Sequence, residues 1–430
     1  MPIDTKHPSY NDNFNKWQRC RDVYEGDDAI KSRGREYLPA IDKNQTDEEY
    51  KSYANRATFF EAVGRTVDGF IGAISRRPHK FNLPTKLQAM LDDANLGGVS
   101  LSELVKKLCK ATLLTGREGI LVDYDEDRMR PYLSVYCAES IINWSATRVV
   151  LSETVFEDDP VDPYKLTSVD QLRELSLVDG VYTVTVWRKD RDAAIDAKWQ
   201  VYGDVIQPTK RGATFDKIPF FWISILGPTA EICKPPLLGM ANVALSHYRL
   251  SADYAHGLHW TGLPTFYVTG SNSDEPVRIG AATAIMLKDP NAKVGYAEFK
   301  GDGLGSLERA IAAKEAQMAV LGAAILGAEA RRVETAEAAR IRHSGETGLF
   351  MAAVSAVQAS LQAALSFAAD WDGASGGVAV ELNDDFISTR LDPQTLVGLV
   401  QAYQAGALSL GGLQQAMQDG DLLPQTAVTE

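Results

Sequence analysis

Apolar residues recur at three- and four-residue spacing along the second half of the chain, which predicts long helices. The first runs from Pro235 to about Gly262, because proline is favoured in a first helical turn and glycine just past the last. It has apolar residues on more than one face, so we expect it to be buried. The second, from about Gly305 to Leu326, has apolar residues close to heptad spacing, which suits packing against neighbouring helices.

The segment between these helices is rich in β-forming residues (LPTFYVTG, ATAIMLKD and VGYAEFKG). A polar, Ala-rich hinge follows the second helix and leads into a third helix from about Thr347 to Ala369. Next come a strand (GVAVEL), a helix capped by Asp392-Pro393 that runs to about Ala405, and a last short helix. This half is therefore predicted to be mainly helical, with a small β-containing insertion.

The first hundred residues predict several helices with clear start signals. A short helix is expected over residues 12–24, and capping boxes start two others, at Thr46–Glu49 and at Ser100–Glu103. Apolar residues keep helical spacing after the first capping box as far as Val63, so a single long helix is predicted there. The helix after the second box should end near residues 115–116, where a glycine stands.

The middle of the chain predicts strands. ILVDY and YLSVY alternate like an antiparallel pair, and VVLSETVFE, GVYTVTVWRK and KWQVYGDVI predict a meander. IPFFWISIL predicts a buried strand, and residues 170–175 a helical turn between strands. Strands in the middle and helices elsewhere predict an α+β fold.

Composition is that of a globular protein, with 45% hydrophobic and 23% charged residues in 430. No stretch of eighteen consecutive apolar residues occurs, so we expect no membrane span, and the polar start of the chain is unlike a signal peptide. Four cysteines are widely spaced without a CxxC, which disfavours zinc and a disulfide framework; Cys109 and Cys137 are expected to be core thiols. The net charge of −13 argues against a tight general DNA binder.

One acidic cluster is a candidate metal site. Asp123, Asp125 and Asp127 alternate like the start of a calcium loop, but Arg128 and Ser134 stand where an EF-hand needs glycine and glutamate. A nuclease-type metal site remains an alternative. The simpler interpretation is a solvated turn between two strands.

Two further motifs are weaker. Asp253, His256 and His259 are three residues apart on the first long helix; they predict packed histidines at a subunit contact, with metal ligation as the alternative. GDGLGS at 301–306 lacks the Lys and Ser/Thr of a phosphate loop, so it predicts a flexible joint. Without a Walker motif the chain is not expected to be a packaging ATPase, and GxSxG and HExxH are absent as well.

The order helix, β insertion, helix, hinge and long helix resembles the core of phage portal proteins. Other segments are similar to one uncharacterised phage portal-like family. They are GREYLP at 34–39, the run at 45–78, LLTGREGILVDYDED at 113–127, PYLSVYCAESIINW at 131–144, ETAEAARIRHSGE at 334–346 and WDG at 371–373. The resemblance extends from about Arg35 to Leu423 and is least familiar over 150–215.

The resemblance implies an α+β portal fold with an α/β wing, a two-helix stem, a small β-containing clip and a helical crown. The implied parts are the wing at 1–234, stem helix 1 at 235–262, the clip at 263–304, stem helix 2 at 305–326, a tunnel loop at 327–339, a long helix with the wing return strand at 340–390, and the crown at 391–430.

The resemblance also implies a structural role without enzyme activity or cofactor. The chain would form a ring, twelve-fold as in the family, at a unique capsid vertex of a virion made in the bacterial cytoplasm. Double-stranded DNA would pass through without sequence specificity, during packaging and ejection. Expected partners are the terminase large subunit, a head–tail adaptor, and the major capsid and scaffolding proteins. The alternatives are a metal-dependent DNA-processing enzyme using the Asp123 cluster, or another capsid or tail structural protein.

Two sets of residues are expected to serve such a ring. Arg331, Arg332 and Arg340 would contact DNA phosphates from the tunnel loop, because guanidinium groups bind phosphate well; ion pairing with nearby glutamates is the alternative. Stem residues would pack between subunits. These are Leu307, Ile311, Met318, Leu321, Ile325 and Tyr248.

Overall fold

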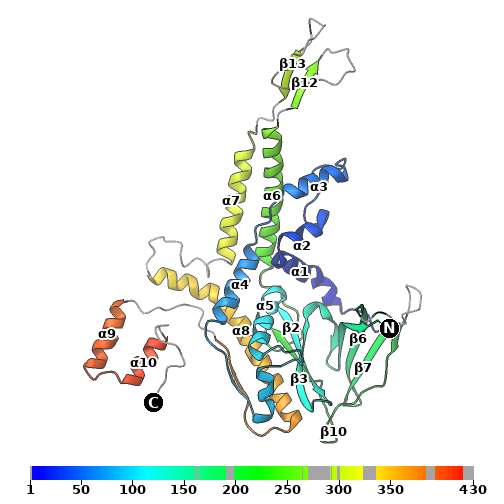
Figure 1. Cartoon of the computed structure of the whole chain (residues 1–430), viewed down its shortest axis with the longest axis vertical. Helices are drawn as coiled ribbons and strands as arrows, with labels where there is room; N and C mark the ends of the chain where they lie inside the picture. Colours follow the sequence, from blue (N-terminus) through cyan, green and yellow to red (C-terminus); the bar gives the residue numbers. More distant parts are fainter. Residues whose placement is uncertain are drawn as a thin grey trace. The chain divides into compact units, whose positions relative to one another are not determined.

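The computed structural model describes residues 2–159, 162, 164–189, 198–263, 265–269, 291, 293–297, 301–322, 336–383 and 393–419. The chain forms two compact units, each built from separate stretches of sequence (Figure 1). Unit 1 comprises Met1–Phe14, Val67–Lys234 and Val333–Glu430; unit 2 comprises Asn15–Thr66 and Pro235–Arg332. Helices and sheets are both present, so the predicted α+β class is confirmed.

The core of unit 1 is a three-stranded antiparallel sheet in the order β11–β2–β3. Its strands are β2 (Arg117–Asp125), β3 (Arg130–Cys137) and β11 (Phe220–Ser224), where IPFFWISIL predicted a buried strand. Helices α5 (Leu101–Thr115) and α8 (Ala336–Asp372) pack against this sheet and against each other. Ser360 of α8 donates a hydrogen bond to the carbonyl of Trp222 at 2.7 Å, which fixes the helix along β11.

The second sheet of unit 1 is a five-stranded antiparallel meander. Its strands are β4 (Ile141–Ser145), β5 (Arg148–Asp158), β6 (Leu166–Val178), β7 (Val181–Lys189) and β8 (Trp199–Val201). The predicted helical turn at 170–175 is wrong, because these residues are the middle of β6. They pair with β5 on one side and β7 on the other, and this double pairing outweighs the local helix preference of QLREL.

A polar network joins the two sheets. Arg173 of β6 donates to Asp123 of β2 at 3.0 Å and is ion-paired with Glu153 of β5 at 2.9 Å. On β3, the Tyr132 hydroxyl donates a hydrogen bond to Asp123, and the Tyr136 hydroxyl donates one to Glu153. Burial by itself lowers the pKa of Arg173, but Tyr136, Glu153 and Asp123 reverse that effect and raise it. Asp123 is therefore part of a structural network.

The long helix α8 is held at its C-terminal half by side-chain amides. The side-chain oxygen of Gln362 accepts a hydrogen bond from the backbone N–H of Val380 at 2.8 Å. The side-chain oxygen of Gln358 accepts one from the backbone N–H of Leu382 at 2.9 Å. This fixes β14 (Ala379–Glu381), which pairs with β1 (Lys80–Asn82). The segment Gly348–Asp372 is long and apolar enough to cross a membrane, with 44% of its most apolar window buried. Core helices pass the same test, and these contacts are those of a core helix.

The remaining elements of unit 1 are small. They include η2 (Thr85–Leu91), η3 (Ala138–Ser140), β9 (Thr209–Lys210), β10 (Ala213–Thr214), α9 (Pro393–Gln404) and α10 (Leu410–Asp419). The second capping box is confirmed, with Ser100 accepting from the Glu103 N–H and Gly116 ending α5 at φ 77°. Cys109 is buried in α5 as predicted, whereas Cys137 is only half-buried.

Two helices run across the boundary between the units, α1 (Pro8–Glu25) and α4 (Ala62–Ile74). Unit 2 also contains α2 (Asp27–Ser32), η1 (Gly34–Glu36) and α3 (Asp47–Arg56). The first capping box is confirmed at Thr46, but the single long helix predicted after it is wrong. The chain leaves the helix at Ala57, because Thr58 exchanges hydrogen bonds with Ser251 and the Phe59 N–H donates to Asp27.

Arg117, the first residue of β2, is fully buried between two indole rings. Its guanidinium carbon lies 3.8 Å from the ring centroid of Trp144 and 4.4 Å from that of Trp222. Its guanidinium nitrogens have no hydrogen-bond partner among the described residues. Burial lowers the pKa of Arg117 to about 9, because low-dielectric surroundings disfavour its charged form; Glu118 and Cys233 act in the opposite direction.

We expect Arg117→Met to stabilise the chain at pH 7. The lowered pKa means that the folded state holds this proton less tightly than the unfolded state does. Wild-type stability should therefore rise with pH between about 9 and 12.5, and below 9 the charge is buried at full cost. The variant should gain on the order of 1–3 kcal/mol in free energy of unfolding at pH 7, and the gain should shrink at pH 10. Urea unfolding at both pH values measures this.

Arg128→Met, an exposed change near the same sheet, is the matched control and should change the free energy of unfolding by less than about 0.5 kcal/mol. A less stable Arg117→Met chain at pH 7 would mean that the two tryptophan contacts outweigh the cost of burying the charge.

Candidate functional site

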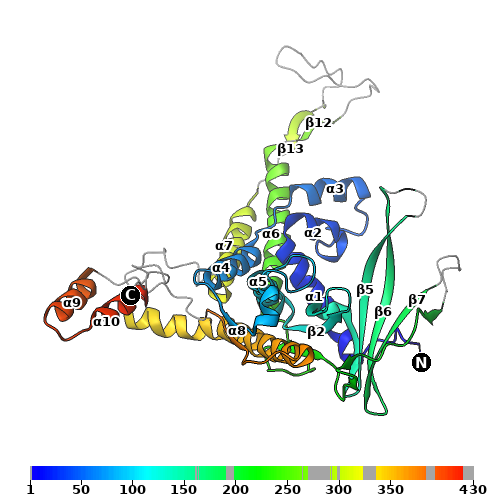
Figure 2. The same ribbon diagram turned by 60° about the horizontal axis from the view of Figure 1, so that its bottom comes forward.

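The most distinctive feature of unit 2 is a pair of long helices joined through a β-ribbon. Helix α6 (Leu238–Gly262) has 25 residues, about 37 Å at 1.5 Å per residue. Helix α7 (Leu304–Leu321) lies along it (Figures 1 and 2). Strands β12 (Thr265–Thr269) and β13 (Lys293–Ala297) follow α6 and precede α7, and they pair antiparallel. Helices are therefore present where they were predicted at 235–262 and 305–326, although the second ends at Leu321.

The N-terminal segment of unit 2 binds one side of α6. Arg249 donates to the carbonyl of Tyr37 at 2.8 Å, and Tyr53 of α3 donates to Asp253 at 2.6 Å. Nearer the start of the helix, Arg19 donates to Asn242 at 2.8 Å. These contacts are spread along α6 and come from residues far away in the sequence. They leave Tyr248 only 1% exposed.

Helix α7 is poorly covered in comparison. Among its residues only Met318 is buried, at 1% exposure. Val320 and Leu321 are 72% and 52% exposed, which is unusual for large apolar side chains on a long helix. Four alanines on its outer side are exposed as well. They are Ala312, Ala313, Ala316 and Ala319. We call the side of the helix that carries these alanines and Val320, with the charged Arg309 among them, the outer α7 face. Leu321 is exposed at the C-terminal end of the helix.

The predicted stem residues divide into three groups. Tyr248 and Met318 are buried inside their own chain and have almost no surface to offer a second copy. Leu307 and Ile311 are half-buried, and Leu321 is exposed. Packing between subunits stays a prediction for those three. Ile325 lies outside the described residues.

The predicted tunnel-loop arginines are not placed by the structure. Arg331 and Arg332 lie outside the described residues. Arg340 lies within the span of α8, where only the course of the backbone is described. The helix begins at Ala336, so the last four residues of the expected loop at 327–339 are helical. Contact with DNA stays a prediction for all three arginines.

The polar residues near the end of α6 make contacts within their own chain. His256 Nε2 accepts from the indole N–H of Trp260 at 2.9 Å, and His259 Nε2 lies 3.1 Å from Arg56. The described residues contain no group of three His, Cys, Asp or Glu side chains that could hold a metal. Burial, Arg56 and His259 lower the pKa of His256, whereas Asp253 opposes the shift. His256 is therefore a packing group whose neutral form is favoured by burial and by the nearby Arg56.

A groove of about 550 Å³ opens beside these histidines in unit 2. No sequence pattern indicates this groove, because its walls come from α3, the loop before α3 and the end of α6. Trp260 and Ile41, which are 49% and 51% exposed, are its large apolar residues. Its full lining is Ile41, Asp42, Asn44, Gln45, Glu49, Ser52, Arg56, His256, His259 and Trp260.

Comparison with known proteins gives one family match. Residues 236–372 match a family model described as a domain of unknown function (DUF4055). The match covers α6, the β-ribbon, α7 and all of α8, which is a minority of the chain. No curated protein matches the sequence.

Solved structures give weak likenesses. A chain from the neck of an empty gene transfer agent particle, computed with C6 symmetry, is 15% identical with a TM-score of 0.45; the match covers 84% of this chain and 90% of that one. A chain from the virion of a native gene transfer agent particle is also 15% identical with a TM-score of 0.45, covering 93% of this chain and 99% of that one. TM-scores below 0.5 do not establish a shared fold.

We expect acid to weaken the packing of α3 on α6 through His256. The lowered pKa means that the folded chain favours the neutral ring. The stability that this ring contributes is complete above pH 6.5 and is lost as the pH falls below that value. His256→Gln keeps an acceptor for Trp260 but does not titrate. The melting temperature of the wild type relative to this variant should therefore be lower at pH 5 than at pH 7.5.

The other histidines are present in both proteins, so the comparison isolates the change at His256. If the difference in melting temperature between the wild type and His256→Gln were the same at pH 7.5 and pH 5, His256 would protonate as easily in the folded chain as in the unfolded one.

Proposed function

We propose that the chain is the subunit of a phage-type portal ring, with the α6–α7 pair as its stem and the β12–β13 ribbon as part of its clip. The supporting observation is the helix pair itself. A 25-residue helix is bound on one side by residues 15–66 of its own chain, and it is paired with a helix whose outer face is uncovered. The order of elements along the chain agrees with the portal-like motifs in the sequence.

The physical reason for proposing a neighbouring subunit is that α7 is poorly covered by its own chain. A helix is stabilised mainly by packing of an apolar face rather than by its own propensity. On α7 one side chain is buried, while four alanines and Val320 lie on the side away from it and Leu321 is exposed at the helix end. Small residues let another helix approach closely. A second copy packed against the outer α7 face and the exposed Leu321 would remove these residues from water, whereas the half-buried Leu307 and Ile311 are on the same side of the helix as Met318.

The β12–β13 ribbon supports the same proposal. A lone two-stranded ribbon is at best marginally stable in water. Tyr267, Val294 and Tyr296 are 44%, 45% and 55% exposed on it. Each strand pairs with the other through five residues, and within the described part of the chain neither has a partner on its outer edge. We propose that neighbouring ribbons pair in the ring, on the side facing terminase and later the head–tail adaptor.

The parts of the subunit follow from this proposal. Unit 1 without α9 and α10 corresponds to the wing, those two helices to the crown, and residues 327–339 to the tunnel loop. Residues 15–66 group with the stem by contact, although they fall within the 1–234 segment expected to be wing. The ring would sit at the capsid vertex, contact capsid and scaffolding proteins, and pass double-stranded DNA. The net charge of −13 suits weak contact with a sliding polyanion.

No observation favours the enzyme alternative. It rests on Asp123, Asp125 and Asp127, yet Asp123 accepts from Arg173 and Tyr132, and Asp125 accepts from the Arg128 N–H at 2.8 Å. The proposal of another capsid or tail structural protein differs in the shape and position of the assembly, which electron microscopy distinguishes.

Electron microscopy of the purified chain should show rings with an axial hole, and Leu321→Asp should reduce them strongly. Leu321 is 52% exposed, so an aspartate there leaves the single chain folded but places an unpaired charge in the proposed contact. Leu226→Asp in unit 1, where the leucine is 59% exposed, is the matched control. Light scattering measures the ring fraction of each variant. Rings unaffected by Leu321→Asp would count against the stem contact.

The tunnel loop is tested separately. We expect the double change Arg331→Glu and Arg332→Glu to leave ring assembly intact and to reduce DNA packaging or retention, because reversed charges repel passing phosphates. Full heads that keep their genome would mean that these arginines only pair with neighbouring glutamates. Changing both to lysine, which preserves the charge, is the control and should package normally.

A further inference from the structure

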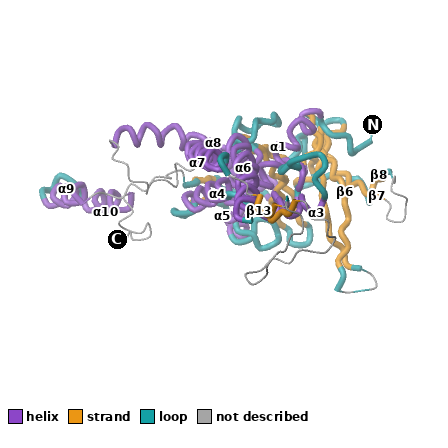
Figure 3. The backbone as a smooth tube through the Cα atoms, turned by 90° about the horizontal axis from the view of Figure 1, so that it is seen from above, coloured by secondary structure: helices purple, strands orange, loops and turns teal. Residues whose placement is uncertain are grey.

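A β-ribbon projects from the second sheet of unit 1. Strand β4 pairs with β5 only as far as Leu151, and β7 pairs with β6 only from Gln171 onward. Strands β5 and β6 nevertheless stay paired out to Asp158 and Leu166. They therefore continue as two strands, with no described strand paired to the outer edge of either one (Figures 2 and 3). We call residues 152–158 and 166–170 the β5–β6 ribbon.

One face of the ribbon is fully exposed. Its six residues alternate along the two strands, as the two-residue period of a strand requires. They are Thr154, Phe156 and Asp158 on β5, and Leu166, Ser168 and Asp170 on β6. Phe156 and Leu166 are 68% and 63% exposed, so no described residue of the same chain covers them. Isolated exposed apolar residues are ordinary, but two on a flat open ribbon mark a contact surface.

The opposite face holds the ribbon in position. Glu157 accepts from Arg188 of β7 at 2.6 Å, and Glu153 at the base accepts from Gln171 at 2.6 Å. The exposed face is therefore presented by a fixed element, with Asp158 and Asp170 beside its apolar residues. Lys165 is paired with Asp159 at 3.3 Å, so the face and its turn are acidic.

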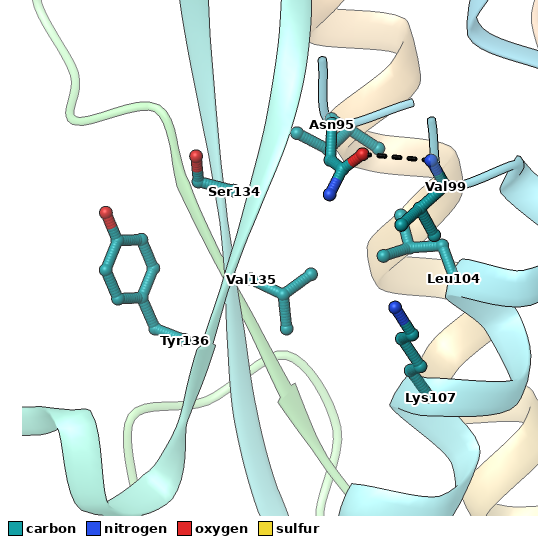
Figure 4. Close-up of a pocket in the computed structure, with 8 residues that line it drawn as sticks. Asn95, Val99, Leu104, Lys107, Ser134, Val135 and Tyr136 are labelled. Carbon is teal, nitrogen blue, oxygen red and sulfur yellow. Dashed lines mark hydrogen bonds between the residues drawn. The ribbon is translucent and has the colours of Figure 1, made fainter. Parts of the chain in front are cut away.

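A groove of about 350 Å³ lies elsewhere in unit 1, between α5 and strand β3 (Figure 4). Figure 4 places Val135 between the groove's two sides, with Asn95, Val99, Leu104 and Lys107 on one side and Ser134 and Tyr136 on the other. Val135 is 37% exposed, and Lys107 forms no ion pair within the described part of the chain. Glu103, one turn earlier, is engaged in capping Ser100. The groove thus has an apolar floor and an exposed positive charge, which interacts with Glu103 without forming an ion pair within the described residues.

The groove also borders an open sheet edge, because β3 is the last strand of the β11–β2–β3 sheet. The Leu133 N–H points away from β2 and donates to the carbonyl of Ala94 at 2.8 Å. Val135, two residues further, has the same orientation, so its N–H and C=O also face outward. Neither has a backbone partner among the described residues beyond the sheet. Such an edge accepts an added strand.

We propose that the exposed face of the β5–β6 ribbon of one copy docks in the α5–β3 groove of a neighbouring copy. Phe156 would enter the groove over Val135 and Leu104, Asp158 would face Lys107, and an open edge of the ribbon would pair with the backbone of Val135. This inference rests on the proposed ring. It adds a contact between the outer domains of neighbouring subunits to the contact between stems.

A second copy is the occupant that these observations favour. The ribbon is acidic and the groove carries an exposed lysine, so the two surfaces on one chain are complementary in charge. A protruding surface and its receptor at different places on one chain make a head-to-tail contact. Repeating such a contact closes a ring when the rotation permits. The size of the groove, at the small end of ligand sites, suits one large side chain.

Charge reversal tests the pairing of Asp158 with Lys107. Asp158→Lys and Lys107→Glu should each raise the dissociation constant of subunits from the ring about tenfold, and the combined variant should return it to within about threefold of the wild type. Both residues are exposed, so neither change should unfold the chain. Mass photometry on dilution measures the dissociation. Two single variants without effect, or a double variant no better than the singles, would overturn the proposal.

Crosslinking tests the geometry directly. In a Cys137→Ser, Cys233→Ser background, Phe156→Cys with Val135→Cys should form disulfide-linked ladders in assembled rings. The control pair, Val178→Cys with Val135→Cys, uses a residue that is 53% exposed at the opposite end of β6 and should not. Rings without crosslinks from the first pair would overturn this contact and leave the ring proposal standing. A wild type that forms no rings would overturn both.

Discussion

The rest of unit 2 depends on how helix α6 is covered. A 25-residue helix with apolar residues on several faces must be shielded from water all round. The chain supplies one cover early, from the segment that contains Tyr37 and Tyr53, and a second late, from α7. Both covers are incomplete toward the end of α6, where Leu258 and Trp260 are 45% and 49% exposed. The sequence thus builds a helix that one chain shields only in part.

Unit 1 meets a different constraint, which is to hold two sheets together through charged residues. Arg173 reaches from the meander to Asp123 of the three-stranded sheet, while Glu153 accepts from Tyr136. Truncating one member would leave a buried charge unpaired, which costs more than the pair itself contributes. The same sheet contains Arg117, which is buried between two tryptophans without a hydrogen-bond partner among the described residues. The base of the β5–β6 ribbon is tied to this network, so the ribbon is fixed in direction.

Structural features that depend on neighbouring residues could be predicted from the sequence, whereas features that depend on pairing with distant residues could not. The capping boxes at Thr46 and Ser100 were found because cap and helix are three residues apart. The break at Ala57 was missed because its cause is Ser251, far away in the chain. QLREL favours a helix by itself, but two neighbouring strands decide its state. The α5–β3 groove had no sequence signal, because its residues meet only once the sheet has formed.

The two proposed contacts between subunits differ in the kind of residue that they expose. On α7 the exposed alanines and Val320 favour close helix packing, which is sensitive to shape. On the β5–β6 ribbon and the α5–β3 groove the exposed residues combine apolar side chains with opposite charges, which steer association and set its register. Apolar contact at the stem would supply affinity, and charged contact at the outer domain would select the rotation between subunits. A ring of fixed number needs both, because affinity alone does not define the angle at which a head-to-tail assembly closes.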